Sequence, residues 1–413
     1  MDGIPSMDCP QDFRCPISME IMKDPVTIST GVTYDRKNIE RWFLTYKKTT
    51  CPATMQCVEA FDMTPNHTLQ RLISAWQSRR SESTPPPAVA ASEKRDELAA
   101  ALGEIDSTPF KVSCLKRLRS IVELGDEVKE DFKRLGGVEV LVRIMEQVLG
   151  ENSDFAVFRA CEEAVAVLRL IPVSDCDEQI LEVLMSSNCM NSMAIVLQRG
   201  GAEARFGAVA TFEKLARADY QWNYAAQDQG VGFFKSLLEI VSDEICSKAS
   251  SCALKLLVQM LEASKKSRLK AIEAGAICTL VELLPESSRS KCERIMQLIK
   301  LLCELAEGRL AFSEHGLGIA AVAKKMLNVS SGGATKIGVK ILMLVASFHA
   351  TEKVLEEMLM CGAVKKLVAL LHVGAGQSTT KERAAKILKL HGREWRRYPC
   401  FTSDVRDYLG LGE

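Results

Sequence analysis

One spacing recurs along most of this 413-residue chain and constrains its fold more than any other feature. A glycine is followed two positions later by an apolar residue, and further apolar residues stand at offsets near 5, 6, 8 and 9. The glycines are Gly136, Gly232, Gly275, Gly318 and Gly362, and Asn188 takes the same place between the first two. After a first interval of 52 residues, the intervals are 44, 43, 43 and 44 residues. Because glycine, and next asparagine, tolerates the left-handed conformation that ends a short helix, we expect a sharp turn between helices at each place.

A second block follows each of these turns and is typical of closely packed helices. Small residues such as Ala208 and Ala253 alternate with leucines that would fill the layer between neighbouring units. A unit of about 43 residues with three helices predicts an α-solenoid of the armadillo/HEAT class, and a plain helical bundle has no reason to keep a constant period. The G-[AV]-[IV]-x-x-L-V-x-L-L segments resemble armadillo repeats. We count six units and a degenerate leading one around residues 110–124.

A change in amino-acid composition indicates where the repeats begin. Residues 81–92 read SESTPPPAVAAS, which predicts a solvated linker with an extended centre. We therefore expect a small domain at 8–82, a Pro/Ser linker at 83–93 and the repeat domain, with about six repeats, at 94–400. The overall fold class is mainly α, with a small α+β domain in front of an armadillo-repeat α-solenoid.

Charge and hydropathy exclude several classes of protein. The 53 basic and 53 acidic residues give a net charge of zero, which argues against the clustered positive charge of a nucleic-acid-coating protein. No run reaches the roughly 18–20 apolar residues of a membrane span, and no signal peptide is visible. We expect a protein of the cytoplasm, with the nucleus as a second compartment, whose 15 cysteines are reduced thiols and mostly small core residues. Nuclear-import armadillo proteins repeat tryptophan along their groove, and here the four tryptophans do not recur with the period: Trp42, Trp76, Trp222 and Trp395.

The small domain predicts a loop, a hairpin, a helix, a second loop and a second helix. Residues 26–29 and 32–34 alternate across Thr30 and Gly31, as two strands joined by a turn do. Asp35 can cap the helix that follows. The two helices carry apolar residues on one face each, which are Ile39, Trp42, Phe43 and Tyr46 in the first and Leu69, Leu72, Ile73 and Trp76 in the second.

The two loops do not carry zinc ligands in a usual pattern. A RING finger pairs cysteines three residues apart, whereas Cys15 is followed by Ser18 and Cys51 by Thr54. The remaining candidates do not complete two tetrahedral sets: Cys9, Cys57 and His67. We expect no metal and no cofactor, and loops held by hydrogen bonds and ion pairs of Ser, Thr, Asp, Glu and Arg. His67 is expected to cap or hydrogen-bond near the start of its helix.

Five segments of the small domain resemble the U-box, a metal-free relative of the RING finger found in ubiquitin ligases. They are F-R-C-P-I-S, M-K-D-P-V, G-x-T-Y-D-R-x-x-I-E-x-W, T-C-P-A-T and P-N-x-x-L, between about Pro10 and Arg80. With the repeats behind it, the chain resembles plant U-box–armadillo ubiquitin ligases, which often act in defence and abiotic-stress signalling. The resemblance implies a RING-type ubiquitin aminoacyltransferase that forms no covalent intermediate and has no catalytic residue of its own. It would restrict a conjugating enzyme's ubiquitin thioester to a reactive conformation.

The resemblance also implies where the charged conjugating enzyme docks. The surface would consist of the first loop, the central helix and the second loop, namely Cys15, Pro16, Ile17, Trp42 and Pro52. Three of these residues have a structural alternative: Ile17 as a buried loop anchor, Trp42 as core and Pro52 as a turn residue. A nucleophilic role for Cys15 or Cys51 needs a perturbed pKa, and nothing basic adjoins either in the sequence.

One departure leaves the function open between two classes. Related modules often carry Arg or Lys two or three residues after the second loop's proline, and here Met55 stands there, with Gln56 as a weaker substitute. The sequence favours a ligase whose repeats hold a protein substrate for transfer to its lysines, and the alternative is a non-catalytic adaptor scaffold. A zinc-dependent nucleic-acid binder is disfavoured by the missing ligands and the zero net charge. A U-box homodimer is a further partner that the resemblance allows, whereas the substrate, conjugating enzyme and chain linkage cannot be read from the sequence.

Overall fold

A computed structural model describes most of the chain. The described residues are 10–58, 61–79, 87–105, 107–151, 153–174, 176–218, 229–243, 246–327, 332–372, 378–396, 406–407 and 410. They form two compact units, one of Met1–Gln229 with Asp243–Ala253 and the other of Gly230–Ser242 with Leu254–Glu413. Each unit is described by itself below.

The small domain begins with a short sheet. After the 3-10 turn η1 (Gln11–Phe13), strand β1 (Pro25–Thr27) pairs antiparallel with β2 (Thr33–Asp35), so the predicted hairpin is confirmed. Gly31 has a φ of 80°, the left-handed conformation that the turn requires. A third strand, β3 (Thr64–Pro65), pairs with the other edge of β1 and gives the order β2–β1–β3. This strand was not predicted, because two residues are too short for a period-two pattern.

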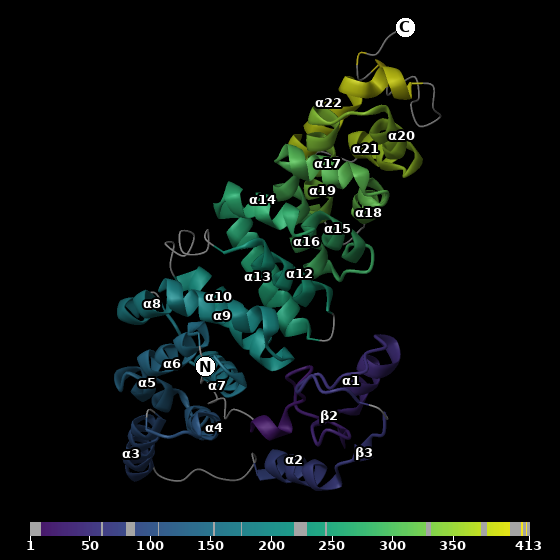
Figure 1. Cartoon of the computed structure of the whole chain (residues 1–413). Helices are drawn as coiled ribbons and strands as arrows, with labels where there is room; N and C mark the ends of the chain where they lie inside the picture. Colours follow the sequence, from purple (N-terminus) through teal and green to yellow (C-terminus); the bar gives the residue numbers. More distant parts are fainter. Residues whose placement is uncertain are drawn as a thin grey trace. The chain divides into compact units, whose positions relative to one another are not determined.

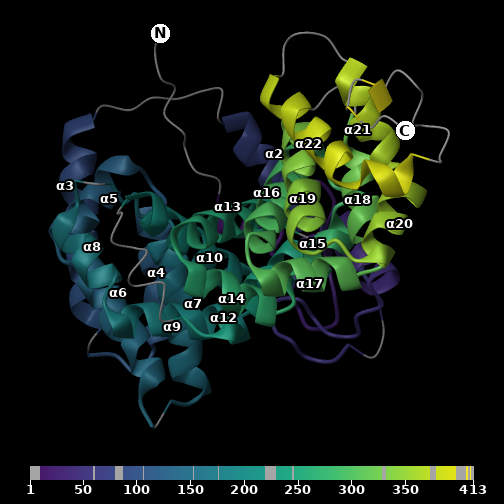
Figure 2. The same cartoon turned by 90° about the horizontal axis from the view of Figure 1, so that it is seen from above.

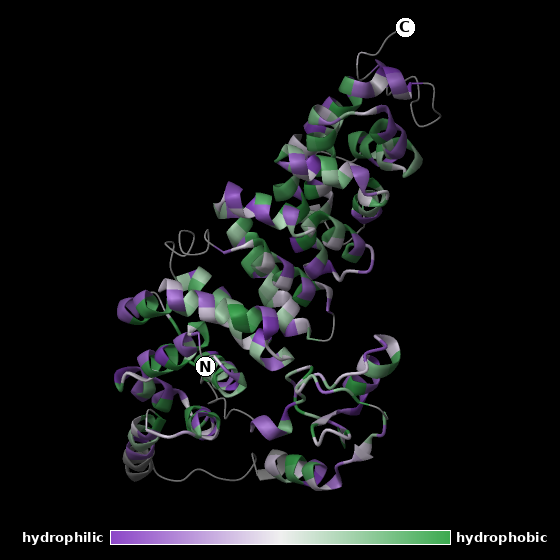
Figure 3. Cartoon of the chain, in the orientation of Figure 1, coloured by the Kyte–Doolittle hydropathy of each residue, from purple (hydrophilic) through white to green (hydrophobic). Residues whose placement is uncertain are grey.

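Two helical segments pack on this sheet (Figure 1). Helix α1 (Arg36–Glu40) continues as the π-helical turn η2 (Arg41–Thr45), and α2 (His67–Arg79) follows β3. The buried core joins all these elements and includes Val26, Tyr34, Ile39, Phe43 and Ile73. Figure 3 shows hydrophobic and hydrophilic residues interspersed along α2. The α+β character of this domain is therefore as predicted.

Three details of the small domain differ from the sequence-based expectation. The side chain of Asp35 does not cap α1, and its Oδ2 instead accepts hydrogen bonds from the backbone N–H of Lys23 at 2.7 Å and Asp24 at 3.3 Å. Asn66, rather than His67, caps α2 by accepting from the N–H of Leu69 at 3.0 Å. Leu72 is exposed and does not share the buried face of α2.

The remainder of the described chain is helical and repeats as predicted. A leading pair, α3 (Pro87–Ile105) and α4 (Lys111–Val122), precedes five groups of three helices and one pair. In the first unit the groups are α5 (Asp126–Arg134), α6 (Gly137–Glu146) and α7 (Phe155–Leu168), with the 3-10 turn η3 (Gln147–Leu149), then α8 (Glu178–Leu184), α9 (Ser187–Arg199) and α10 (Ala202–Ala218). The pair is α12 (Val231–Ser242) and α13 (Ser247–Ala263). The second unit continues with α14 (Lys265–Glu273), α15 (Ala276–Leu283), α16 (Arg289–Cys303), α17 (Ala306–Glu314), α18 (Gly318–Lys325), α19 (Gly332–Phe348), α20 (Glu352–Met360), α21 (Ala363–His372) and α22 (Ser378–Trp395). This is the armadillo arrangement.

Neighbouring repeats stack through equivalent helices. In the second unit α16 packs on α19, and α19 packs on α22, while α15 lies against α18 (Figure 2). Ala208 of α10 and Ala253 of α13, which the sequence predicted at helix contacts, are both buried. These repeats of the second unit thus pack against their neighbours, as in other solenoids.

The recurring glycine has two structural roles rather than the one predicted. Gly136, Gly275 and Gly362 have φ of 73°, 85° and 73°, as expected for a left-handed turn. Gly318, at the start of α18, keeps an ordinary φ, but a Cβ there would lie 2.5 Å from the carbonyl oxygen of Phe312. The prediction of a left-handed turn is wrong there and at Gly232 and Asn188, which lie within α12 and α9. Ser186 caps α9 instead, accepting from the N–H of Cys189.

The join between the small domain and the repeats is only partly described. Residues 80–86 lie outside the described residues, as does Trp222, and α3 begins at Pro87, inside the stretch predicted as a linker. Proline suits the first turn of a helix, since its missing N–H would have no helical partner there. Within the described residues no single helix combines the length and apolarity of a membrane span; α8 and α9, bent by 60°, meet those criteria only as a pair.

Candidate functional site

Two loops of the small domain share one hydrogen-bonding plan. In the first, the N–H of Cys15 donates to the carbonyl of Glu20 at 2.8 Å, and the N–H of Met19 donates to the carbonyl of Cys15 at 2.8 Å. In the second, the N–H of Cys51 donates to the carbonyl of Gln56, and the N–H of Met55 donates to the carbonyl of Cys51, both at 2.8 Å. A β-bridge closes each loop, Arg14 with Ile21 and Thr50 with Cys57. The sequence spacing C-P-x-x-M therefore builds the same turn twice.

In each turn, the methionine that ends the C-P-x-x-M segment has a left-handed backbone conformation. Met19 and Met55 both have a backbone φ of 59°, a conformation that residues other than glycine and asparagine seldom adopt. The two methionines differ in their surroundings, since Met19 is buried and Met55 is 61% exposed. The second loop therefore presents the Met55 side chain to solvent.

The cysteine thiols hold the loops to the rest of the domain. The Cys51 Sγ lies 3.0 Å from the Tyr34 hydroxyl and accepts a hydrogen bond from the Thr30 hydroxyl at 3.3 Å. The Cys15 Sγ accepts from the backbone N–H of Asp35 at 3.3 Å and from Asn38 Nδ2 at 3.5 Å. Both thiols thus hydrogen-bond to groups of other segments of the domain.

Tyr34 is the link between strand β2 and the second loop. Its hydroxyl accepts a hydrogen bond from the N–H of Ala53 at 3.1 Å, which leaves its proton for the Cys51 sulfur. The side chain is fully buried, and burial raises its pKa far above the usual value of 10.0. Burial also raises the pKa of the Cys51 thiol, but hydrogen bonds from Thr30, Thr54 and Tyr34 outweigh it, so the net shift of that pKa is downward.

The first loop is fixed by amide and ionic contacts. Asn38 Nδ2 donates to the Ser18 hydroxyl at 2.9 Å, which ties α1 to this loop. Asp24 forms an ion pair with Arg36 at 2.7 Å between Oδ2 and Nε. The predicted use of Ser, Asp and Arg contacts is confirmed, whereas the roles of Tyr34 and Asn38 were missed. Strand alternation could have marked Tyr34 as buried, but its hydroxyl partners come from residues 17 and 19 positions away.

The five predicted docking residues lie around these two loops, with different exposures. Cys15 and Pro52 are buried, Pro16 is half-buried, and Ile17 is 1% exposed and belongs to the domain core. The environments of Ile17 and Pro52 thus agree with their structural alternatives, and the docking role of all four residues stays a prediction.

The position of Trp42 is compatible with a docking contact and with a core residue. Its ring is half-buried against the core, and its Nε1–H donates to the carbonyl of Thr50 at 2.7 Å. The indole therefore connects η2 to the second loop. The central helix is tied to both loops, by Asn38 to the first and by Trp42 to the second.

This arrangement suits positioning rather than covalent chemistry. The Cys15 and Cys51 thiols are 0% exposed and act as hydrogen-bonding groups within the fold. A nucleophile must reach its substrate, so a buried structural thiol is poorly suited to that role. What the domain offers instead is two rigid loops joined to one helix.

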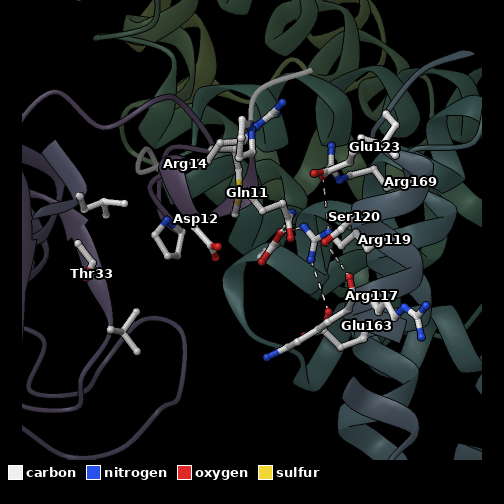
Figure 4. Close-up of a pocket in the computed structure, with 18 of the residues that line it drawn as sticks. Gln11, Asp12, Arg14, Thr33, Arg117, Arg119, Ser120, Glu123, Glu163 and Arg169 are labelled. Carbon is white, nitrogen blue, oxygen red and sulfur yellow. Dashed lines mark hydrogen bonds and ion pairs between the residues drawn. The ribbon is translucent and has the colours of Figure 1, made fainter. Parts of the chain in front are cut away.

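A second cluster of charged residues lies in the repeats (Figure 4). Arg119 on α4 is 4% exposed, and its guanidinium lies 3.5 Å from Glu163 Oε2 on α7 and also pairs with Glu203 on α10. Burial raises the pKa of Glu163, against the attraction of Arg119. Because these ion pairs join three packed helices, we interpret the cluster as a structural network.

Comparisons with known proteins identify both parts of the chain. The U-box domain family matches residues 9–82, and the family described as the plant U-box protein ARM repeat region matches residues 96–407. The chain is 36% identical to the E3 ubiquitin-protein ligase PUB23 of Arabidopsis thaliana, over 97% of this chain and 96% of that protein. It is 34% identical to PUB22 of the same plant, over 97% and 98%. An engineered protein of known crystal structure shares the fold at 17% identity, with a TM-score of 0.50 over 80% of this chain and 76% of that one. The chain belongs to the plant U-box–armadillo family of ubiquitin-protein ligases, which are RING-type transferases without a covalent enzyme intermediate.

Proposed function

We propose that the two loops and η2 dock a ubiquitin-charged conjugating enzyme, and that ubiquitin is transferred to lysines of a protein held by the armadillo repeats. The observation that carries this proposal is the bonding of one helical segment to both loops, through Asn38 and Trp42. A helical segment hydrogen-bonded to both loops loses little freedom when a partner binds. It can therefore hold the partner's thioester in one orientation, which is the source of rate acceleration in a positioning mechanism.

The repeats supply a surface of the kind that binds protein segments. On the second unit a depression of about 460 Å³ lies over α16 and is lined by Arg289, Glu293, Arg294 and Gln297, with Ile337 of α19 at its edge. Charged and amide groups beside an aliphatic side chain suit a peptide rather than a small apolar ligand. Equivalent helices of an armadillo array line its extended binding face.

The biological setting belongs to the same proposal. The family resemblance supports a role in plant stress or defence signalling, in the cytoplasm with access to the nucleus. A protein co-purified with the repeats and modified only when the U-box is intact would support the assignment of substrate binding.

Trp42 gives the most direct test of docking. Trp42→Ala removes both the ring and the bond to Thr50, whereas Trp42→Phe keeps an aromatic ring and removes only the bond. If the ring is the docking anchor, we expect Trp42→Ala to reduce ubiquitin-chain formation at least tenfold, and Trp42→Phe to retain most of it. Chain formation is measured with a panel of conjugating enzymes, beside the thermal stability of each full-length variant.

A matched control separates docking from folding. Trp76 on α2 packs edge-on to Phe13 with ring centroids 6.0 Å apart, away from the η2 bond to Thr50, so Trp76→Phe should leave transfer unchanged. Normal transfer by Trp42→Ala would remove Trp42 from the docking site. Lost transfer with an unfolded small domain would assign Trp42 to the core alone.

The adaptor alternative rests on Met55. Its exposed side chain stands where related modules often have a basic residue, so the U-box could bind a conjugating enzyme without activating it. Binding of the charged enzyme without any discharge of its ubiquitin would favour this second function.

A further inference from the structure

The cysteines of the repeats are not all core residues. Of the 13 described cysteines, three of which lie in the small domain, six are buried, three are half-buried and four are exposed, so fewer than half are the fully buried core residues that were expected. One exposed cysteine, Cys278, lies beside two other groups that can bind a metal. The three residues are Cys278 and Glu282 on α15 and His315 directly after α17.

The donor atoms of these residues converge. Cys278 Sγ lies 3.5 Å from Glu282 Oε1, His315 Nε2 lies 3.9 Å from the same oxygen, and all three donors lie within 4.8 Å of one another. In a tetrahedral zinc site, bond lengths of about 2.0–2.3 Å place ligand atoms roughly 3.3–3.8 Å apart. Small side-chain rotations would therefore bring the three donors to bonding positions.

The backbone explains why the three groups meet. Cys278 and Glu282 are four residues apart, so they lie on one face of α15, one turn from each other. His315 ends α17, which packs against α15 in the same unit. Within the described residues this is the single group of three such donors that lies this close together.

We propose that Cys278, Glu282 and His315 form a surface site for Zn²⁺, with water as the fourth ligand. One thiolate, one imidazole and one carboxylate are the donor types that zinc accepts together, and their mixed softness disfavours Mg²⁺ and Ca²⁺. Both Cys278 and Glu282 are exposed, so an ion can reach them from solvent.

Charge balance supports a divalent ion at this place. The Cys278 thiol donates its proton toward the Glu282 carboxylate. Zn²⁺ would displace that proton to solvent, and its two positive charges would balance the thiolate and the carboxylate. The bond from the thiol to zinc replaces the S–H bond, with no change of oxidation state.

One contact opposes the site and limits its affinity. The N–H of Leu317 donates to His315 Nδ1 at 3.3 Å, which in a neutral ring places the proton on Nε2. Zinc at Nε2 would require the proton to move to Nδ1, so this long hydrogen bond would be given up. We therefore expect a site of moderate affinity.

The test is metal binding by the full-length protein. Co²⁺ added to the reduced protein should give one equivalent of thiolate-to-cobalt charge-transfer absorption together with the visible bands of a tetrahedral ion, and Zn²⁺ should displace it. Cys278→Ser should abolish the charge-transfer band, and Cys278→Ser and His315→Gln should each weaken zinc binding at least tenfold, as measured by calorimetry.

Cys361 provides the matched control. It is also exposed and follows a glutamate, Glu357, at the same four-residue spacing, but it belongs to no such three-donor group in the described residues. Cys361→Ser should bind metal as the wild type does, and equal thermal stability of the metal-free variants checks their folding. Absence of the band in the wild type, or zinc binding by Cys278→Ser or His315→Gln equal to that of the wild type, would overturn the proposal. A loss in Cys361→Ser as large as in Cys278→Ser would do so too.

Discussion

Removing one oxygen atom from the small domain should weaken its second loop. Tyr34→Phe keeps the buried ring but deletes the hydroxyl that accepts from the N–H of Ala53 and contacts the Cys51 sulfur. Each lost hydrogen bond costs about 0.5–1.5 kcal/mol, and a buried donor left without a partner costs about 1–3 kcal/mol. We therefore expect a loss of about 2–3 kcal/mol of unfolding free energy.

This loss is large for so small a domain. Stability of about 0.05–0.15 kcal/mol per residue gives roughly 4–10 kcal/mol for a domain of about 70 residues. A loss of 2 kcal/mol would lower its melting temperature by about 8–16 °C. Because the second loop belongs to the proposed docking surface, ubiquitin transfer should fall at temperatures at which the repeats remain folded.

Hydrogen exchange in the full-length protein locates the effect. In Tyr34→Phe, peptides that contain Ala53 should exchange at least tenfold faster than in the wild type, while peptides of α16 should not change. Thr45→Val removes an exposed hydroxyl from the same domain and should leave both unchanged. Unchanged exchange at the second loop in Tyr34→Phe would refute the assigned role of this hydroxyl.

The pH dependence of stability at alkaline pH provides a second test of Tyr34. The pKa of Tyr34 is raised in the folded protein, so near pH 10 the unfolded chain releases a proton that the folded domain keeps. Stability from this group is therefore fully present below about pH 10 and declines as pH rises above it. The Tyr34→Phe variant has no phenolic proton to lose at this position, so its free energy of unfolding should fall less steeply with pH in this range.

Two further predictions concern metal and activation. A chelator should leave the fold and the ubiquitin transfer of the small domain unchanged, because Ser18 and Thr54 stand where a RING finger has ligands; loss of its fold on chelation would contradict a metal-free U-box. Met55→Arg should raise ubiquitin discharge several-fold and Met55→Leu should not, as measured in single-turnover assays; equal rates for the two variants would show that a basic group at this position is immaterial.

The architecture could be read from the sequence because it depends on periodic patterns. A constant interval of about 43–44 residues predicts stacked three-helix units, and the alternation around Gly31 predicts the hairpin. Both features are local or repeated, so each is visible without knowledge of the folded chain. Strand β3 failed this condition, because two residues carry no period.

The functional groups could be predicted from the sequence only in part, because their contacts join residues that are distant in the chain. Loop motifs identified the U-box, but the hydroxyl of Tyr34 reaches a cysteine 17 positions away, and no spacing rule indicates that partner. His315 lies 33 residues from Glu282, directly after a different helix, so the three-donor group becomes visible only when α15 and α17 are placed together. The expectation of no metal was drawn from the small domain's loops and could not address this group.

The recurring glycine shows how one pattern can hide two physical causes, and its variants should reveal them. At Gly275 the φ of 85° requires a left-handed residue, but nothing lies within 4 Å of an added Cβ. Gly275→Ala should therefore cost about 1–2 kcal/mol, and Gly275→Asn less, since asparagine tolerates this conformation.

At Gly318 the backbone is ordinary, but an added Cβ would lie 2.5 Å from the carbonyl oxygen of Phe312, which is part of α17 and cannot rotate away. Both Gly318→Ala and Gly318→Asn should therefore destabilise the repeats by about 1–3 kcal/mol or more, with no advantage for asparagine. Denaturant unfolding of the four full-length variants measures these differences. If asparagine proved milder than alanine at Gly318 as well, conformational strain rather than close packing would be the reason for glycine there, and the distinction between the two positions would be wrong.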